Sequence, residues 1–179
     1  PLLDLQSFNE NNFNDWLNNN NYYFFYTIHT AIKPNLLLSN GDRIKYINLE
    51  ENPLFDINEF MNEVDILLND YSATTTDYAL LDRAQIFCMP DYDKYWNYKG
   101  VSFIPIDAKN TPYREILPGP EVHTYDELLV SIKDASNNYE GFINRYRSQS
   151  NNILDKFYNT NYSNSSENIY QLMKTIINS

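Results

Sequence analysis

Short apolar runs divide the first two thirds of the chain. Tyr22–His29 is a continuous aromatic and β-branched run, and its length predicts a strand that is buried on both faces. Val64–Leu68 and Gln85–Met89 predict two further buried strands, and Arg43–Leu49 and Val101–Ile106 predict two more. Continuous apolar runs of this kind are typical of parallel sheets, because helices cover both faces of such sheets.

Segments with apolar residues at helical spacing lie between and after these strands. The spacing predicts helices over Phe8–Asn19, Asp56–Asn62, Asp77–Asp82, Asp91–Tyr98, Tyr125–Ala135, Tyr139–Tyr158 and Glu167–Ile177. Asp56 is a candidate N-cap, and Thr124 with Glu127 three residues later predicts a capping box. Asp70–Thr76 predicts a turn rich in hydroxyl groups, and Pro112–Pro120 predicts an irregular loop.

The alternation of strands and helices predicts βαβ crossovers and therefore the α/β class. We expect a Rossmann-like parallel sheet with flanking helices, and a helical C-terminal tail that packs over the sheet. The 179 residues suit one domain. We expect a βα core over 1–135 and C-terminal helices over 136–179. Because the chain begins at Pro1 rather than at Met, we also expect it to be a piece of a longer protein.

Composition narrows the possible functions. The net charge of −11 argues against binding to nucleic acid and against adhesion to anionic lipid by charge alone. Cys88 is the single cysteine, so neither an intramolecular disulfide nor a cysteine zinc cluster can form. No apolar run approaches the roughly 20 residues of a membrane span. The sequence contains neither a metal-binding motif nor a GxSxG motif, so we expect no bound metal.

A cluster of hydroxyl groups follows the strand predicted at Val64–Leu68. It consists of Ser72, Thr74, Thr75 and Thr76. Ligands of open parallel sheets bind at the carboxyl ends of strands, where the next helix offers unpaired backbone N–H groups to an anion. The cluster can therefore bind phosphate. A helix cap by Ser72 or Thr74 is the simpler interpretation, and the pattern alone favours it.

The two histidines receive different interpretations. His29 lies at the carboxyl end of the first strand, where an imidazole can act as a base or contact a phosphate. A half-buried histidine bonded to a backbone carbonyl explains the same position equally well. Lys33 can add a second cation there, although a solvated loop lysine is favoured. His123 is expected at the surface.

Acidic and aromatic residues follow the strand predicted at Gln85–Met89. Asp91 and Asp93 can cap the next helix or contact a sugar hydroxyl of a ligand, and capping is favoured. Several aromatic residues beyond them can stack on a base, but their helical spacing favours packing in the core. They are Tyr92, Tyr95, Trp96 and Tyr98.

The segment VDILLNDYSATTTDYALLDRAQIFCMPDYDKYWNYKG, residues 64–100, resembles a stretch typical of the CDP-glycerol glycerophosphotransferase family, of the teichoic-acid and capsule polymerase type. The resemblance continues through Pro118-Gly119-Pro120 and Thr124 to Glu127-Leu128. Upstream, YYFFYTIHTAIKP is similar to the family's strand that ends in His-Pro. Ala73 stands where the family has a second serine, and Thr30 rather than proline follows His29.

This resemblance implies a GT-B fold, of which the chain is the C-terminal, donor-binding domain without its N-terminal partner domain. It implies a transferase that moves glycerol phosphate, or a similar polyol phosphate, from a CDP-activated donor to a polymer hydroxyl and releases CMP, in teichoic-acid or capsule synthesis. The implied residues are His29 for catalysis, Ser72, Ala73, Thr74 and Thr75 for the donor phosphates, and Asp70, Asp77 and Asp91 as supporting motif positions.

The resemblance also implies the surroundings of the reaction. The substrate is CDP-glycerol or a related CDP-polyol, the acceptor is a polymer or lipid-linked hydroxyl, and no other cofactor is predicted. The location is the cytoplasm or the inner face of the membrane, and the chain alone is expected to be inactive. Two alternatives remain open, a nucleotide-sugar glycosyltransferase with the same donor domain and a degenerate binding module without catalysis.

Overall fold

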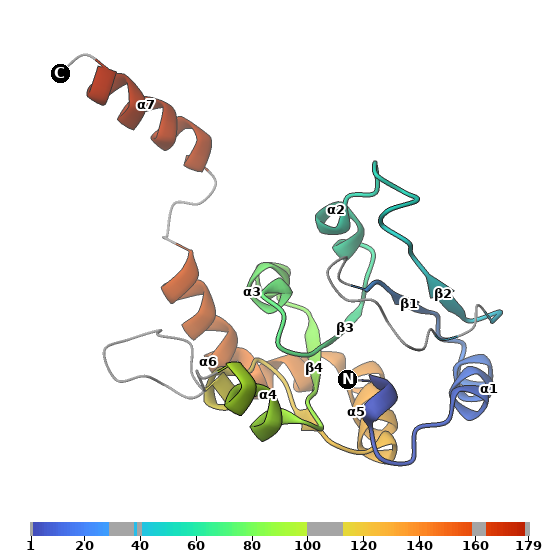
Figure 1. Cartoon of the computed structure of the whole chain (residues 1–179). Helices are drawn as coiled ribbons and strands as arrows, with labels where there is room; N and C mark the ends of the chain where they lie inside the picture. The colour runs from blue at the N-terminus through green and yellow to red at the C-terminus, as the bar shows by residue number, and fades with distance from the viewer. Residues whose placement is uncertain (1, 29–37, 39–40, 100–112, 159–163, 178–179) are drawn as a thin grey trace.

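The computed structural model describes residues 2–28, 38, 41–99, 113–158 and 164–177 (Figure 1). Its elements are η1 Leu2–Asp4, α1 Glu10–Asn20, β1 Phe24–Tyr26, β2 Ile44–Tyr46, α2 Ile57–Met61, β3 Ile66–Asn69, α3 Thr74–Ala79, β4 Ala84–Cys88, α4 Tyr92–Lys99, η2 Tyr113–Ile116, β5 Glu121–Val122, α5 Tyr125–Asn137, α6 Tyr139–Phe157 and α7 Ser165–Ile177. The expectations for His29, Lys33 and Val101–Ile106 lie outside the described residues, as do those for the side chains of Trp96 and Tyr98.

The described strands pair in two sheets, and every pairing is parallel. β1 pairs with β2, with Phe24 opposite Ile44, while β4 lies between β3 and β5. The α/β class with parallel strands and flanking helices is therefore confirmed. The described strands form two separate hydrogen-bonded sheets rather than one continuous sheet. β5 is a strand that the apolar pattern did not predict, because it has only two residues and depends on its pairing with β4.

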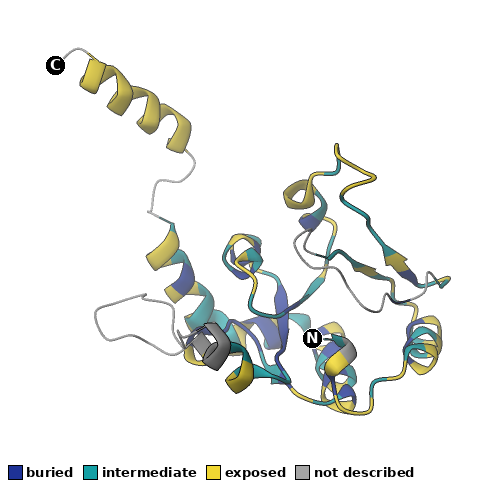
Figure 2. Ribbon diagram, viewed as in Figure 1, coloured by how far each residue is buried: buried dark blue, intermediate teal, exposed yellow. Residues whose placement is uncertain are grey.

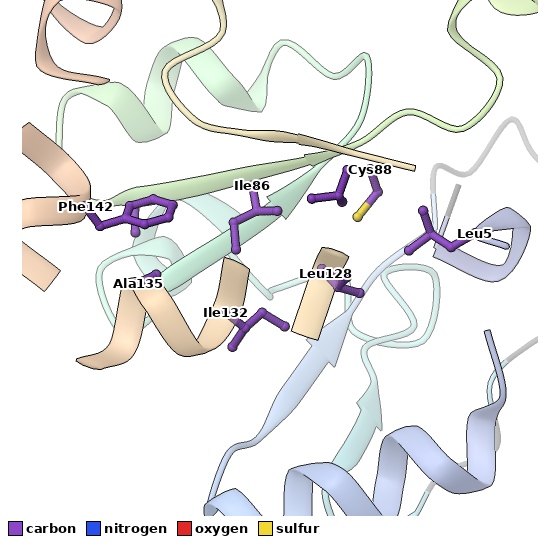
Figure 3. Close-up of a cluster of buried hydrophobic side chains, with 9 residues drawn as sticks. Leu5, Ile86, Cys88, Leu128, Ile132, Ala135 and Phe142 are labelled. Carbon is purple, nitrogen blue, oxygen red and sulfur yellow. The ribbon is translucent and has the colours of Figure 1, made fainter. Parts of the chain in front are cut away.

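β4 is the centre of the core, and all five of its residues are buried. Side chains of a strand alternate between its two faces. Ile86 and Cys88 join the cluster that α5 and α6 cover, as Figure 3 shows. Phe87 packs with Ile116 and Leu117 in a separate cluster. α5 and α6 therefore cover one face of β4, while the segment around η2 packs on the other, where Gln85 also bonds to Thr75 of α3.

The C-terminal helices divide into a packed pair and an exposed one. α5 begins with the predicted capping box, in which the Thr124 hydroxyl accepts from the Glu127 N–H at 3.2 Å and the Glu127 carboxylate accepts from the Thr124 N–H at 3.2 Å. α5 and α6 pack against each other and against β4. Every residue of α7 is exposed, and α7 lies apart from the sheets (Figure 2). The expectation that the whole tail packs over the sheet is therefore wrong for α7.

The first strand differs from its prediction. Phe13 of α1 is fully buried and meets Phe24 edge to face, with ring centroids 5.3 Å apart. On the opposite side of β1, Phe25 is 44% exposed. The strand has only three residues. It is not buried on both faces, because α1 covers one side and solvent reaches the other.

The turn after β3 becomes helical earlier than predicted. α3 begins at Thr74 rather than Asp77, and its N-cap residue Ala73 makes no side-chain capping bond. The helix ends at Ala79, and Asp82 adopts the left-handed conformation with φ 49°. Part of the hydroxyl cluster therefore lies in the helix rather than in a turn. Likewise, the loop predicted at Pro112–Pro120 contains the short 3-10 helix η2.

Candidate functional site

The buried side-chain amide of Asn69 supports the turn between β3 and α3. Asn69, at the carboxyl end of β3, is buried, and its Nδ2 donates to the Ser72 carbonyl at 3.4 Å and to the Thr75 hydroxyl. Thr75 is 3% exposed, and its carbonyl accepts from Gln85 Nε2 at 3.3 Å. The Thr75 hydroxyl therefore points into the protein and supports the turn.

The hydroxyl groups of Ser72 and Thr74 lie together at the surface of this turn. Their oxygens lie 2.8 Å apart, and the Ser72 hydroxyl accepts from the Thr74 backbone N–H at 3.3 Å. Ser72 thus bonds to the backbone at the start of α3, but the N-cap position belongs to Ala73, so the prediction that Ser72 or Thr74 caps the helix is wrong. The Thr76 hydroxyl instead donates to the Ala73 carbonyl at 2.7 Å. Because Ser72 and Ala73 are exposed, a ligand at the surface can still reach this turn.

Tyr71 connects the turn to the segment that follows β4. Its hydroxyl donates to Asp91 Oδ1 at 2.9 Å, and its ring stacks on Tyr95 with centroids 3.7 Å apart. Burial of the phenol, followed by the hydrogen bond to Asp91, raises the pKa of Tyr71 well above its usual range. Tyr71 therefore stays protonated and remains a donor to the Asp91 carboxylate. This contact between the Asp91 carboxylate and Tyr71 was not predicted from the sequence.

An open pocket of about 430 Å³ lies at the carboxyl ends of β4 and β5. In open α/β sheets, this edge is where ligands bind. Its lining combines acidic, basic and aromatic side chains, namely Met89, Pro90, Asp91, Tyr92, Asp93, Lys94, Arg114 and His123. The pocket thus presents both hydrogen-bond donors and hydrogen-bond acceptors to a ligand.

Glu121 of β5 pairs with two basic side chains that line the pocket, Arg114 and His123. Its two oxygens accept from Arg114 Nε at 2.6 Å and from Arg114 Nη2 at 2.7 Å, and His123 Nε2 lies 3.1 Å from Oε1. The guanidinium also lies over the Tyr92 ring, 4.1 Å from its centroid. The hydrogen bond to Glu121 is the main cause that raises the pKa of Arg114. The sequence indicated His123 only as a surface residue, and its side chain is indeed 48% exposed.

Sequence reasoning missed Arg114 and Glu121 as site residues. The available signal was a basic and an acidic residue on either side of Pro118-Gly119-Pro120. A proline-rich segment of that kind can bring its flanks into a fixed relation. The signal was weak, because ion pairs near loops are common on protein surfaces.

The remaining expected positions lie around the turn. Asp70 lies near enough to Tyr71 for its charge to contribute to the raised pKa of that phenol. The Asp77 carboxylate accepts from the hydroxyl of Tyr158, at the end of α6. Within the described residues, no group of His, Cys, Asp and Glu side chains is arranged to hold a metal ion. The part of the chain that the structure describes also has no helix long and apolar enough to cross a membrane.

Comparison with known proteins gives a consistent family. Residues 4–175 match the family model described as CDP-glycerol:poly(glycerophosphate) glycerophosphotransferase. The chain is 32% identical over 85 residues to a teichoic acid poly(ribitol-phosphate) polymerase of Bacillus spizizenii (strain ATCC 23059 / NRRL B-14472 / W23), covering 48% of this chain and 12% of that protein. It is 33% identical over 82 residues to a teichoic acid poly(glycerol phosphate) polymerase of Bacillus subtilis (strain 168), covering 45% of this chain and 10% of that protein. The chain thus spans about a tenth of the length of these relatives.

Solved structures of the wall teichoic acid polymerase TagF share the fold. A TagF variant superposes with a TM-score of 0.60 at 26% sequence identity, covering 88% of this chain and 35% of that one. The same variant soaked with CDPG gives a TM-score of 0.61 at 26% identity, covering 88% of this chain and 36% of that one. The chain therefore shares its fold with about a third of a longer protein.

Proposed function

Since the chain belongs to the CDP-glycerol:poly(glycerophosphate) glycerophosphotransferase family, we propose that it is the donor-nucleotide-binding domain of a polyol-phosphate transferase. The family consists of transferases. The observation that carries the proposal is the family match over residues 4–175, which includes both the hydroxyl turn after β3 and the segment after β4. In the proposed reaction, glycerol phosphate or a similar polyol phosphate moves from a CDP-activated donor to a hydroxyl of a polymer.

The chemistry requires a nucleophile and a leaving group. An acceptor hydroxyl oxygen attacks the β-phosphorus of the donor, a new phosphodiester bond forms, and the bond to CMP breaks, so that CMP leaves with the electron pair. The hydroxyl proton passes to a base, and we assign this role to His29 because an imidazole titrates near neutral pH. The same imidazole is also suited to contact the donor phosphates.

We assign the donor phosphates to the turn after β3. Ser72 and Thr74 supply hydroxyl donors at the surface, and Ala73 contributes its backbone between them. Thr75 does not offer its hydroxyl to the ligand, because that hydroxyl bonds to Asn69. It belongs to the same site because this bond supports the turn. Asp70, Asp77 and Asp91 are supporting positions. Donors placed in advance at a pyrophosphate stabilise the charge that develops as CMP leaves.

The context of the reaction is part of the proposal. The donor is CDP-glycerol or a related CDP-polyol, and the name of the Bacillus spizizenii poly(ribitol-phosphate) polymerase favours CDP-ribitol as the second candidate. The acceptor is a polymer or lipid-linked hydroxyl of teichoic-acid or capsule synthesis. A second GT-B domain faces this one in the working enzyme, which acts in the cytoplasm at the inner face of the membrane.

Calorimetric titration of the 179-residue chain with CMP, CDP-glycerol and UDP-sugars tests the proposal. We expect binding of CMP and CDP-glycerol, and a loss of about 1–3 kcal/mol of binding free energy in Ser72→Ala, because a hydrogen bond to a charged phosphate is removed. Ser148→Ala is the matched control, since Ser148 is an exposed serine of α6. Binding of none of the compounds favours the non-catalytic module, and a preference for UDP-sugars favours the glycosyltransferase.

A further inference from the structure

The pocket at the carboxyl ends of β4 and β5 lies beside the proposed phosphate turn. Tyr71 directly precedes Ser72, and its hydroxyl reaches Asp91 in the pocket wall at 2.9 Å. The pocket volume of about 430 Å³ is within the range of small-molecule sites. A nucleotide whose phosphates lie at the turn can therefore place its base in this pocket.

The pocket lining contains both hydrogen-bond donors and hydrogen-bond acceptors. Arg114 and His123 supply N–H donors, and both are held by the same Glu121 carboxylate. The pairing with Glu121 uses Nε and Nη2 of Arg114, so Nη1 takes no part in it. Asp91 and Asp93 supply carboxylate acceptors from the start of α4. A ligand that fits this lining carries acceptors for the basic side chains and a donor for a carboxylate.

Cytosine and uracil both carry acceptors and a donor, but they differ in where the donor lies: cytosine has it on the amino group at C4, whereas uracil has it at N3, between two carbonyl oxygens. Cytosine presents an amino donor at N4, and a carboxylate side chain is a suitable acceptor for it. Its ring nitrogen and carbonyl oxygen are acceptors for the basic side chains. Uracil presents a carbonyl oxygen in place of the amino group, and a carboxylate repels that oxygen. A carboxylate at this position can therefore distinguish the two bases.

We propose that this pocket binds the nucleobase of the donor and that Asp91 selects cytosine over uracil by accepting the N4 amino group. The inference rests on the proposed function, because it needs a nucleotide donor. Asp91 is chosen over Asp93 because its carboxylate is held in place: Tyr71 donates to Oδ1, and the Tyr71 ring is stacked on Tyr95. Asp93 is exposed. A fixed acceptor loses less entropy on binding than a mobile one.

The test compares CMP with UMP in calorimetric titrations of the full chain and of Asp91→Asn. An asparagine side chain can both donate and accept, so it tolerates either base. We expect the wild-type chain to prefer CMP, and the CMP-to-UMP affinity ratio to fall roughly tenfold in Asp91→Asn, the discrimination that one good base contact provides. Asp155→Asn removes the same charge from the exposed face of α6 and should leave the ratio unchanged.

Each result decides between the inference and the broader proposal. In Ser72→Ala, both nucleotides should weaken by the same factor, because both carry the phosphate. If the wild-type chain prefers CMP and Asp91→Asn keeps that ratio, the base assignment fails and the donor-binding function stands. A fall in the ratio for Asp93→Asn, without one for Asp91→Asn, overturns the choice of residue. Equal wild-type affinity for CMP and UMP overturns the selectivity, and binding of neither overturns both proposals. Thermal unfolding of each variant confirms that it is folded.

Discussion

Gly119 lies where the segment before β5 passes close to the backbone of β4. A Cβ atom built at this position would lie 1.9 Å from the Gln85 carbonyl oxygen and 3.3 Å from the Phe87 ring. The first contact is with backbone in the middle of the sheet, which a side-chain rotation cannot relieve. Gly119→Ala therefore forces the segment before β5 away from β4.

The cost follows from the contacts that this movement disturbs. Overpacking of a core costs about 1–3 kcal/mol. The neighbouring bond, in which the Phe87 N–H donates to the Pro120 carbonyl at 2.9 Å, contributes about 1 kcal/mol more when it breaks. We expect Gly119→Ala to lower the free energy of unfolding by roughly 2–4 kcal/mol, the sum of these two contributions.

Urea unfolding followed by circular dichroism measures this loss. With a slope of about 2 kcal/mol per molar urea, the midpoint should fall by about 1–2 M. Gly141→Ala is the matched control, because the three atoms nearest to its Cβ would all belong to the exposed side chain of Asn138, which can rotate away. That change lies in α6 and should gain up to about 1 kcal/mol from helix propensity. Equal midpoints for the two variants would refute the close approach of Gly119 to β4.

Two further predictions concern single side chains. Thr124→Ala removes the capping box of α5, so the free energy of unfolding should fall by about 1 kcal/mol in the same urea assay, and an unchanged midpoint would contradict the cap. Burial raises the pKa of the Cys88 thiol to about 12, so the native chain should resist a thiol-reactive disulfide reagent at pH 8 and react rapidly in urea. Because the folded pKa is the higher one, the thiol's contribution to stability is complete below about pH 9 and is lost as the pH rises toward 12. Rapid labelling of the native chain would show that Cys88 is accessible.

The elements that the sequence predicted well are those determined by local signals. The capping box at Thr124 and the N-cap at Asp56 depend on residues within one helical turn, and both are confirmed. β5 and the exposure of Phe25 depend on which distant segments pack against them. α7 shows the same limit, because its periodic apolar residues predict a helix but do not reveal whether anything covers it.

The candidate site shows the same difference between local signals and long-range contacts. The hydroxyl turn is contiguous in sequence, so its composition alone pointed to it. Arg114 and His123 become neighbours only when Glu121 pairs with β4 and holds both of them. A pocket assembled from three segments leaves no periodic or spaced pattern in the sequence.

Ala73, the departure from the family pattern, removes a hydroxyl from the proposed phosphate site. The geometry of its neighbours limits that loss. Ser72 and Thr74 lie on either side of it, and their hydroxyl oxygens are 2.8 Å apart. Two hydroxyls at that distance can bond to the same phosphoryl group, while Ala73 takes part only through its backbone. Substitution at position 73 should therefore matter less to donor binding than substitution at Ser72, since the hydroxyl of Ser72 also bonds to the helix backbone.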